Sequence, residues 1–319
     1  MISTRILITG GAGFIGSHVV DHLVAGGGHV VVVDNFSNST DRWIADHVRR
    51  GDVTVHELDV LRTDDLADVL AAERIESVVH LAASVDMRVG LENNWIDVEQ
   101  SVLGTRSVLE AMRRTTARRI TFSSSSTVYG EPERYPTAED QGPMLPISVY
   151  GAAKLAAEGL ISAYNHLYGI EAAIFRFGNV VGGRMNHGVI YDFMAKLTHD
   201  PQRLTVLGDG RQRKNYFLAE DCARGILELA SAARGGVLVA NLGTPDTVAV
   251  SRIAQIVLEE MGLDATVSYG TDSRGWPGDV PVVEFDLSRA HSLGWRASHS
   301  SEQALREAVR RLRKEASYA

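Results

Sequence analysis

Short apolar runs alternate with longer stretches of helical periodicity through the first half of the chain. The runs are rich in Val and Ile and follow one another as RILITG, HVVVVD, VTVHEL, SVVHLA, RRITFSS and AAIFRF. Between them, apolar residues recur at helical spacing, first at Phe14, Ile15, Val19, Val20, Leu23 and Val24, and later at Val98, Val102, Val108, Leu109 and Met112. This alternation predicts an α/β fold in which crossover helices join the strands of a doubly wound parallel sheet. Such sheets bind ligands beyond the carboxyl ends of their strands.

After about residue 178 the alternation becomes irregular. Helical patterns continue in VIYDFMAKLTH, from Glu220 and from near Ser251, and the chain closes on the amphipathic run ALREAVRRLRKEA. We therefore predict two domains, over residues 1–178 and 179–319, with segments of the second half able to return to the first domain. The closing run is expected to bury an apolar stripe and to leave its basic face in solvent.

Composition and charge narrow the possible partners. The 319 residues are 45% hydrophobic and 23% charged, as in a globular protein with a packed core. The net charge of -8 at pH 7 argues against nucleic acid or an anionic membrane surface as a partner. A signal-peptide pattern and the roughly 18 consecutive apolar residues of a membrane span are both lacking, so a cytoplasmic location is expected. Cys222, the single cysteine, excludes an intrachain disulfide and is expected to be a packing residue rather than a reactive thiol.

The first apolar run ends in TGGAGFIGSH, where Gly10, Gly13 and Gly16 lie between a strand and a helix. Glycines at this spacing permit a tight turn, approach of a pyrophosphate to the backbone and close helix packing, and the helix N-terminus favours an anion. Asp34 ends the second run, where a carboxylate would accept hydrogen bonds from ribose hydroxyls and repel a 2′-phosphate. This set predicts a Rossmann domain that binds NAD rather than NADP. Asp59 either holds the adenine amino group or caps a helix.

Tyr150 and Lys154 stand four residues apart in SVYGAAKLAAEGLISAY and so share one face of a predicted helix. A Tyr hydroxyl has an unperturbed pKa of about 10, so it can act as a general base only beside a cation, and both Lys154 and the positive charge of the nicotinamide would lower its pKa. The serine run FSSSSTVYG supplies a hydroxyl for the oxygen that alternates between alcohol and carbonyl. The pattern predicts an NAD-linked enzyme. His18 and His22 have no accompanying Cys/His cluster, so no metal site is expected.

With these motifs, the chain resembles the extended short-chain dehydrogenase/reductase family, and within it the sugar-nucleotide epimerases and dehydratases typified by UDP-galactose 4-epimerase. The resemblance covers nearly the whole chain and rests on TGGAGFIGSH, HLAA, SSSSTVYG, YGAAK, FRFGNVVGGR, LGDGRQRKNY and DLSRAHSLGW. It implies that residues 1–178 bind NAD and carry the catalytic residues, while the smaller C-terminal lobe, 179–319, mainly binds substrate.

The resemblance also implies a role for individual residues. Ser125 would be the catalytic hydroxyl beside Tyr150 and Lys154, although Ser124 and Ser126 lie close enough to leave the choice open. The implied cofactor-binding residues are Gly10, Gly13, Phe14, Ile15, Gly16, Asp34, Asn35, Ser37, Asp59, Val60, Leu81, Ala82, Ala83, Ser123, Tyr150, Lys154 and Phe177. The implied substrate-binding residues are Ser125, Ser126, Thr127, Tyr150, Asn179, Gly188, Val189, Thr205, Leu207, Arg213, Lys214, Arg274 and Val283.

Ser126 and Thr127 bear on the reaction. Dehydratases of this family resemble the present stretch but carry an Asp-Glu pair at these two positions, and its decarboxylases tend to carry Glu at the second, because elimination needs an acid and a base. The two hydroxyl residues favour 4-epimerisation of a UDP-hexose through a 4-keto intermediate, either UDP-glucose and UDP-galactose or the N-acetylhexosamine pair. The alternatives are a dehydratase or decarboxylase of the same family and a non-catalytic NAD-binding regulator.

The chain departs from the family pattern where the diphosphate is expected. Lys214 and Asn215 stand where Arg and Asp are usual, and Arg213 is adjacent. Trp276 stands in place of an Arg, with Arg274 displaced by two positions. Which of Arg213, Lys214 and Arg274 holds the diphosphate is therefore open.

Further positions concern the sugar, the base and assembly. Val283 either leaves room for an N-acetyl group on the sugar or is a core valine. Ser101 stands where Asn is common in the family. Thr205 and Leu207 match positions that line the nucleobase. The resemblance implies a homodimer through helices around residues 92–113 and 150–168, although the apolar positions of these helices equally fit an intrachain core. The hexose and the base are not determined by the sequence.

Overall fold

The computed structural model describes residues 5–83 and 93–316, and the chain divides into two units. Unit 1 comprises Met1–Val128, Val149–Arg176 and Ala223–Ala240; unit 2 comprises Tyr129–Ser148, Phe177–Cys222 and Asn241–Ala319. None of the helices within the described ranges is long and apolar enough to cross a membrane.

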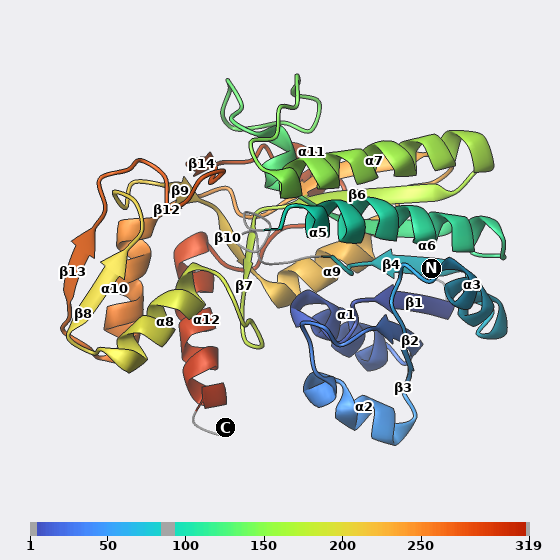
Figure 1. Cartoon of the computed structure of the whole chain (residues 1–319), viewed down its shortest axis with the longest axis horizontal. Coiled ribbons are helices and arrows are strands. Elements are labelled where there is room, and N and C mark those ends of the chain that lie inside the picture. Colours follow the sequence, from blue (N-terminus) through green and yellow to red (C-terminus); the bar gives the residue numbers. More distant parts are fainter. Residues whose placement is uncertain (1–4, 84–92, 317–319) are drawn as a thin grey trace. The chain divides into compact units, whose positions relative to one another are not determined.

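Unit 1 is built on a seven-stranded sheet with the order β11-β6-β5-β4-β1-β2-β3 (Figure 1). The strands are β1 (Arg5–Thr9), β2 (His29–Asp34), β3 (Val53–Glu57), β4 (Ser77–His80), β5 (Arg119–Ser125), β6 (Glu171–Phe177) and β11 (Val237–Leu242). β1 pairs in parallel with β2 on one side and with β4 on the other. The predicted doubly wound parallel sheet is confirmed, and β11 is an additional strand that the pattern does not predict. The strand order reverses beside β1, so the carboxyl ends of β1 and β4 mark the switch point where such sheets bind ligands.

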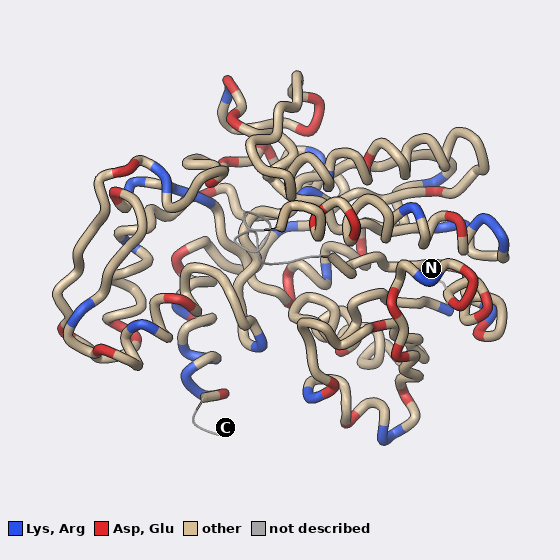
Figure 2. The backbone as a smooth tube through the Cα atoms, in the orientation of Figure 1, with Lys and Arg blue, Asp and Glu red and all other residues tan. Residues whose placement is uncertain are grey.

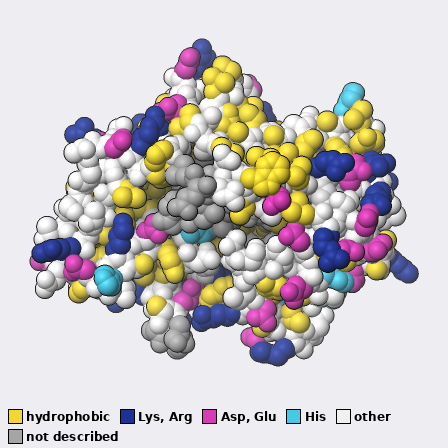
Figure 3. All heavy atoms as spheres, in the orientation of Figure 1, with side chains coloured by type: hydrophobic (Ala, Val, Ile, Leu, Met, Phe, Trp, Pro, Cys, Tyr) yellow, Lys and Arg dark blue, Asp and Glu magenta, His cyan; other side chains and the backbone are white. Residues whose placement is uncertain are grey.

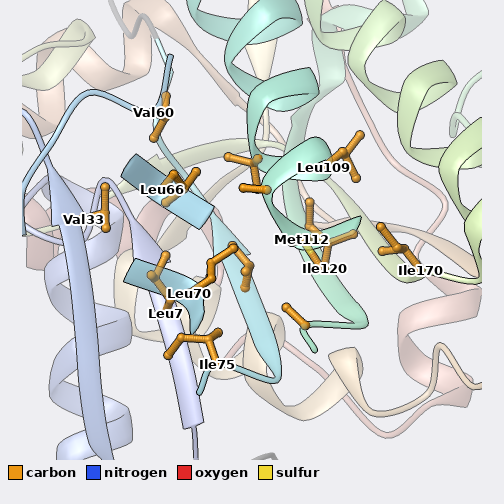
Figure 4. Close-up of a cluster of buried hydrophobic side chains, with 14 of the residues drawn as sticks. Leu7, Val33, Val60, Leu66, Leu70, Ile75, Leu109, Met112, Ile120 and Ile170 are labelled. Atoms are coloured by element: carbon orange, nitrogen blue, oxygen red, sulfur yellow. The ribbon is translucent and has the colours of Figure 1, made fainter. Parts of the chain in front are cut away.

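Helices α3 (Thr63–Ala72), α6 (Gly104–Arg113) and α7 (Val149–Tyr168) lie side by side on one face of this sheet (Figure 1). Alternate strand residues point toward these helices and form the main apolar core of unit 1, because side chains of a strand alternate between its two faces. Figure 4 shows this core, which includes Leu7, Val33, Val78, Ile120 and Ile174 from the strands and Leu66, Leu70, Leu109, Met112 and Ile161 from the helices.

The other face of the sheet is covered by α1 (Phe14–Ala25) and α9 (Ala219–Ala230) (Figure 1). Here the intervening strand residues, such as Ile6 and Val79, meet Leu227 of α9 around a cavity of about 60 Å³. The short helices η1 (Asp41–Trp43) and α2 (Ala45–Arg50) precede β3. The sheet is therefore buried on both sides, which explains why its strands read as nearly continuous apolar runs.

The helix predicted from the apolar spacing of Val98 to Met112 is not continuous. α5 (Trp95–Asp97) leads into a π-helix, η2 (Val98–Leu103), and α6 begins only at Gly104. A π-helix holds more residues in each turn than an α-helix, and such segments concentrate at functional sites. This segment packs against α7, and its neighbourhood buries the polar side chains of Asp97 and Ser101.

Unit 2 contains α8 (Val189–His199), α10 (Val250–Met261), α11 (Ser288–Ser292) and α12 (Ser301–Ala316). Its small sheets pair β7 (Asn179–Val181) with β10 (Tyr216–Leu218), β8 (Arg203–Val206) with β13 (Thr266–Tyr269), and β9 (Arg213–Lys214) with both β12 (Val248–Ala249) and β14 (Val282–Val283). The core includes the fully buried Trp295, whose ring lies 6.1 Å from that of Phe217. Cys222 is also fully buried, and burial raises the pKa of its thiol well above its ordinary value, so it is a packing residue as predicted.

The two units differ from a single division near residue 178. The segment 223–240 returns to unit 1, as the predicted division allows, whereas 129–148 belongs to unit 2, which that division does not include. The second difference has a clear cause, because the Thr137 N–H donates to the Glu284 carbonyl at 2.8 Å and the Thr137 carbonyl accepts from Asp286 N–H at 2.9 Å. These hydrogen bonds join segments far apart in the sequence, so no local pattern predicts them.

α12 has the amphipathic character that its sequence predicts. Its buried stripe consists of Ala304, Leu305, Ala308, Val309 and Leu312. On its other side Arg306 pairs with Glu259 and Glu260 of α10, and Figure 2 marks the basic positions along the helix. The basic face therefore forms ion pairs within unit 2, in addition to facing solvent.

Candidate active site

The glycine turn between β1 and α1 has room only for glycine at two of its positions. Gly10 adopts a φ of 70°, and its N–H donates to the Val33 carbonyl at 2.8 Å. A Cβ atom on Gly16 would lie 2.1 Å from the Gly10 carbonyl oxygen, and one on Gly10 would lie 2.9 Å from the Ala82 nitrogen. α1 begins at Phe14, so its N-terminal N–H groups follow directly from this turn.

Asp34, at the carboxyl end of β2, is buried and holds the glycine turn in place. Its Oδ2 accepts a hydrogen bond from Ala12 N–H at 3.0 Å, and its Oδ1 accepts from Phe36 N–H at 3.0 Å and from the Ser39 hydroxyl at 2.9 Å. A carboxylate has about four lone-pair sites, so Asp34 keeps acceptor capacity for a ribose hydroxyl. The sequence gives no sign of its contacts with Ala12 and Ser39.

Asp59 does not cap α3, whose N-cap is Arg62 with no side-chain hydrogen bond, and instead holds the turn before that helix. Its Oδ1 accepts from Leu61 N–H at 2.9 Å in the turn before α3, and its Oδ2 accepts from Asn35 Nδ2 at 3.0 Å. The Asn35 Oδ1 in turn accepts from Ser37 N–H at 3.1 Å. A contact between Asp59 and adenine stays a prediction.

His80 ends β4 and lies entirely inside unit 1, between two threonines. Its Nδ1 is 2.7 Å from Thr9 Oγ1 and its Nε2 is 3.1 Å from Thr105 Oγ1. Burial, together with the nearby Lys154 cation, lowers the pKa of His80 to about 3, so the ring is neutral. Leu81, Ala82 and Ala83 follow, and the Ala82 N–H donates to Thr9 Oγ1 at 3.3 Å.

The serine run at the end of β5 is held by successive turns of α7. The Ser123 carbonyl accepts from Lys154 Nζ at 2.9 Å, and the Ser124 hydroxyl donates to Glu158 Oε1 at 2.5 Å. The Ser125 side chain lies close enough to Tyr150 to lower the pKa of its hydroxyl. Of the three candidate serines, Ser125 is therefore the one that the structure brings to Tyr150.

Thr127 hydrogen-bonds Ser125, and its assignment to substrate binding stays a prediction. It lies in η3 (Ser126–Tyr129), and both its N–H, at 3.2 Å, and its hydroxyl, at 2.9 Å, donate to Ser125 Oγ. Ser125 Oγ therefore accepts two hydrogen bonds from a single residue. In the chain by itself, Thr127 therefore helps to hold the Ser125 side chain in place.

The charges around Tyr150 and Lys154 are buried. Burial, with a smaller contribution from the Asp97 carboxylate, raises the pKa of Tyr150 to about 12, while the nearby Ser125 side chain acts in the opposite direction. Burial lowers the pKa of Lys154 to about 8, while the negative charges of Asp97 and Glu158 oppose this. Burial therefore dominates the pKa of Tyr150 in the chain by itself, and the lowering expected from Lys154 and the nicotinamide charge stays a prediction. Forming the Tyr150 anion requires a further positive charge.

Sequence reasoning misses the buried charges behind this set. Arg176 donates to Glu158 through Nε at 3.0 Å and Nη2 at 2.7 Å. Two signals are available, since Arg176 interrupts an apolar strand and Glu158 follows Lys154 at helical spacing. Ser101 is buried, and its hydroxyl has no hydrogen-bond partner among the described residues.

In unit 2, two of the three candidate cations converge on Asp279. Lys214 Nζ forms an ion pair with Asp279 Oδ1, and Arg274 Nη1 donates to the Asp279 carbonyl at 2.7 Å. Arg274 Nη2 also donates to Glu131 at 2.9 Å. Arg213 lies apart from this cluster, with its side chain 52% exposed and 3.5 Å from Glu284.

The other substrate candidates of unit 2 are spread over several elements. Asn179 starts β7 and donates through its backbone N–H and its Nδ2 to the Asn215 carbonyl, at 3.1 and 3.2 Å. Gly188 has a φ of 95° and precedes Val189, the first residue of α8. Thr205 is exposed on β8, and Leu207 is 53% exposed just after it.

Val283 and Phe177 are both buried. Val283 is 6% exposed and pairs with Lys214 between β14 and β9, which agrees with the core-valine alternative. The Phe177 ring packs edge-on against Phe217 at 6.4 Å. The structure places both in the interior of unit 2, and their roles toward substrate and cofactor stay predictions.

Comparisons with known proteins define the class. Residues 6–243 match the model of the NAD dependent epimerase/dehydratase family, and the chain belongs to this family. It is 30% identical to the UDP-glucuronate 4-epimerase of Thermodesulfobacterium geofontis, covering 95% of this chain and 94% of that one. Among solved structures, it matches a UDP-galactose 4-epimerase at 36% identity and a TM-score of 0.87, covering 98% and 99% of the two chains. It matches the UDP-glucose 4-epimerase of Thermotoga maritima with UDP-glucose at 30% identity and a TM-score of 0.88, with the same coverage. The predicted family and its cofactor, NAD, are confirmed.

Proposed function

We propose that the protein interconverts the two C4 epimers of a UDP-hexose in an NAD-dependent reaction. One observation carries this proposal: Ser125, Tyr150 and Lys154 are assembled, while the neighbouring positions 126 and 127 hold Ser and Thr rather than the acids that elimination requires. The relatives named as 4-epimerases of UDP-galactose, UDP-glucose and UDP-glucuronate support the same reaction and leave the C6 substituent open.

The residues of unit 1 fit NAD. The glycine turn excludes a Cβ at Gly10 and Gly16, the Asp34 carboxylate keeps acceptor capacity, and the buried Ser101 hydroxyl is available for a ligand. We assign the pyrophosphate to the glycine turn and the adenosine ribose to Asp34. Bound NAD would accept a hydride from C4 of the sugar and later return it. Its positively charged nicotinamide is the further cation that the Tyr150 anion requires.

The chain's own residues then move one proton. Tyr150 takes the proton of the C4 hydroxyl as that oxygen becomes a carbonyl, and Ser125, held by Thr127, donates a hydrogen bond to the same oxygen. Lys154, fixed by the Ser123 carbonyl, stabilises the negative charge on Tyr150. Once the 4-keto sugar has turned over, Tyr150 gives the proton back. Inversion requires that the nucleotide be held firmly and the hexose loosely.

The decisive experiment offers four donors to the protein: UDP-glucose, UDP-galactose, UDP-N-acetylglucosamine and UDP-glucuronate. Products are followed by mass spectrometry and proton NMR. An isomer of unchanged mass with an inverted C4 is expected from at least one donor, and the best donor identifies the hexose. Loss of water or of carbon dioxide would instead identify a dehydratase or a decarboxylase, and turnover of none would favour a non-catalytic regulator.

Lys214 is expected to matter more for substrate binding than its neighbour Arg213. We propose that Lys214 and Arg274, gathered at Asp279, hold the diphosphate. Lys214→Met should raise KM for the UDP-hexose by about 10- to 100-fold, the effect of losing a charge-assisted hydrogen bond. Arg213→Met removes an equal charge one residue away and should change KM by less than about 3-fold, as surface charges generally do. A larger effect for Arg213→Met in initial-rate measurements would reverse the assignment.

We further propose a homodimer that uses α7. Exposed small and apolar residues form a stripe along this helix at Ala152, Ala156, Gly159, Ala163 and Leu167. On neighbouring elements Trp95 is 55% and Leu103 40% exposed, and Figure 3 shows hydrophobic side chains gathered over this side of unit 1. Residue 92, at which the first of the two expected dimer helices begins, lies outside the described residues. A cytoplasmic location belongs to the same proposal, because a lone protonated thiol suits a reducing compartment.

Ala156→Arg should turn this dimer into a monomer. An Arg in the middle of the α7 stripe would bring two like charges together across a two-fold axis and leave them desolvated. Light scattering after size-exclusion chromatography should show about half the wild-type mass, with an unchanged circular dichroism spectrum. Arg224→Ala on α9 is the control. A dimeric Ala156→Arg protein would place the interface elsewhere.

A further inference from the structure

α7 carries a third polar side chain, that of Glu158, on the same face as Tyr150 and Lys154. Tyr150, Lys154 and Glu158 follow one another at intervals of one helical turn. Glu158 is 6% exposed, and its carboxylate is held by Arg176, 3% exposed, in a two-point ion pair. An ion pair buried this deeply is costly to form and tolerates loss of one partner poorly.

Glu158 contacts β5 next to the catalytic serine. Its Oε1 accepts from the Ser124 hydroxyl, while one turn earlier Lys154 donates to the Ser123 carbonyl at 2.9 Å. Two adjacent residues of the strand are thus fastened to α7 immediately before Ser125, whose hydroxyl must meet Tyr150 on that helix. Because Arg176 lies on β6, Glu158 also ties this strand to the arrangement.

Glu158 adds a negative charge to the surroundings of Lys154. The titratable groups facing Lys154 are Asp97 from α5, Glu158 and Tyr150 from α7, and His80 from β4. Of these, only the two carboxylates favour the charged ammonium, since His80 is neutral.

We propose that Glu158, held by Arg176, is a positioning residue for the reaction: it fixes the end of β5 against α7 so that Ser125 meets Tyr150, and it provides a buried counter-charge for Lys154. The positioning part rests on the proposed epimerase function, whereas the electrostatic part concerns Lys154 alone. The two parts can therefore be tested separately.

The counter-charge is tested without any substrate. The chain has four lysines, Lys154, Lys196, Lys214 and Lys314, so NMR of isotope-labelled lysine ε-carbons gives a simple spectrum in which Lys154→Met identifies one signal. Glu158→Gln by itself would strand the Arg176 cation, so the variant is E158Q/R176M, which removes both charges and keeps an acceptor for Ser124. Its Lys154 signal should titrate at a lower pH than the wild-type signal, because Glu158, and not Arg176, is among the charges that act on Lys154.

Three controls sharpen this reading. Glu158→Asp keeps the charge and should leave the Lys154 signal titrating close to its wild-type pH. Glu73→Gln removes an equal charge from the surface of unit 1, where Glu73 contacts His56, and should leave Lys154 unchanged. Ser124→Ala keeps every charge and should also leave the Lys154 titration unchanged. An unshifted Lys154 signal in folded E158Q/R176M would overturn the counter-charge.

The positioning part is read from kinetics. Ser124→Ala should lower kcat by about 10-fold with little change in KM, because a small displacement of a catalytic group affects the chemical step. In E158Q/R176M the alkaline limb of the kcat profile should move to lower pH, since Lys154 loses its proton earlier. A wild-type kcat in Ser124→Ala would overturn the positioning part. This test does not depend on whether the double variant folds. If the wild-type protein converts no UDP-hexose, the proposed function fails while the Lys154 titration still decides the counter-charge.

Discussion

Replacing Tyr150 with Phe is expected to lower kcat for UDP-hexose interconversion by a factor of about 10²–10⁴, the usual contribution of a positioned general acid–base group. The substitution removes only the hydroxyl that exchanges a proton with the C4 oxygen, so Ser125 and Lys154 keep their places. The Tyr150 side chain is held in α7 rather than by its hydroxyl, and the fold should be unaffected. Initial rates, thermal melting and the amount of bound NAD together check this expectation.

Tyr164→Phe is the matched control for Tyr150→Phe. Tyr164 lies on the same helix, and its hydroxyl donates to Glu110 at 2.5 Å on α6. Its loss should leave kcat within about 2-fold of the wild-type value, because surface substitutions away from special features have small effects. If both variants were equally active, the proton would have to be moved by another group.

Replacing Gly16 with Ala is expected to abolish detectable NAD binding. The new Cβ would lie 2.1 Å from the Gly10 carbonyl oxygen and 2.8 Å from the Gly11 Cα, and both are backbone atoms that no side-chain rotation can move. The turn must open, which separates Ala12 N–H from the Asp34 carboxylate. The strain should cost about 1–3 kcal/mol of stability, as other overpacked sites do, and it would displace the N–H groups assigned to the pyrophosphate.

Gly236→Ala separates this effect from a general cost of losing a glycine. A Cβ at Gly236 meets nothing within 4 Å, and its φ lies outside the left-handed region. The control should retain the wild-type melting temperature within a few degrees and its full content of NAD. Normal cofactor content in Gly16→Ala, measured by absorbance after denaturation, would contradict the assigned role of the turn.

The strands of unit 1 could be predicted because a sheet buried on both faces needs nearly continuous apolar runs. β11 is not predicted as a strand, because its first residues are only half-buried at the edge of the sheet. The placement of residues 129–148 in unit 2 could not be predicted either, because it depends on hydrogen bonds between Thr137 and residues far along the chain. Local periodicity contains no information about such distant partners.

The candidate site divides in the same way. Ser125, Tyr150 and Lys154 are visible in the sequence because their chemistry requires fixed residue types at fixed spacing on one strand end and one helix. Asp97 is not, because it acts only through charges that α5 and α7 bring together after folding, and Arg176 is marked only as a charge within an apolar strand, which does not reveal its partner. The convergence of Lys214 and Arg274 on Asp279 likewise depends on how the loops of unit 2 pack.

The hydrogen bonds that join Ser123 and Ser124 to α7 affect how the sequence of such a protein can diverge in evolution. The groups assigned to proton transfer and their supports lie within residues 123–127 and 150–158, one strand end and one helix of unit 1. The candidate groups for the nucleotide lie in unit 2, which can accumulate substitutions such as Lys214 and Trp276 without altering those distances. A lineage built this way can change which sugar nucleotide it accepts while inheriting its catalytic geometry intact.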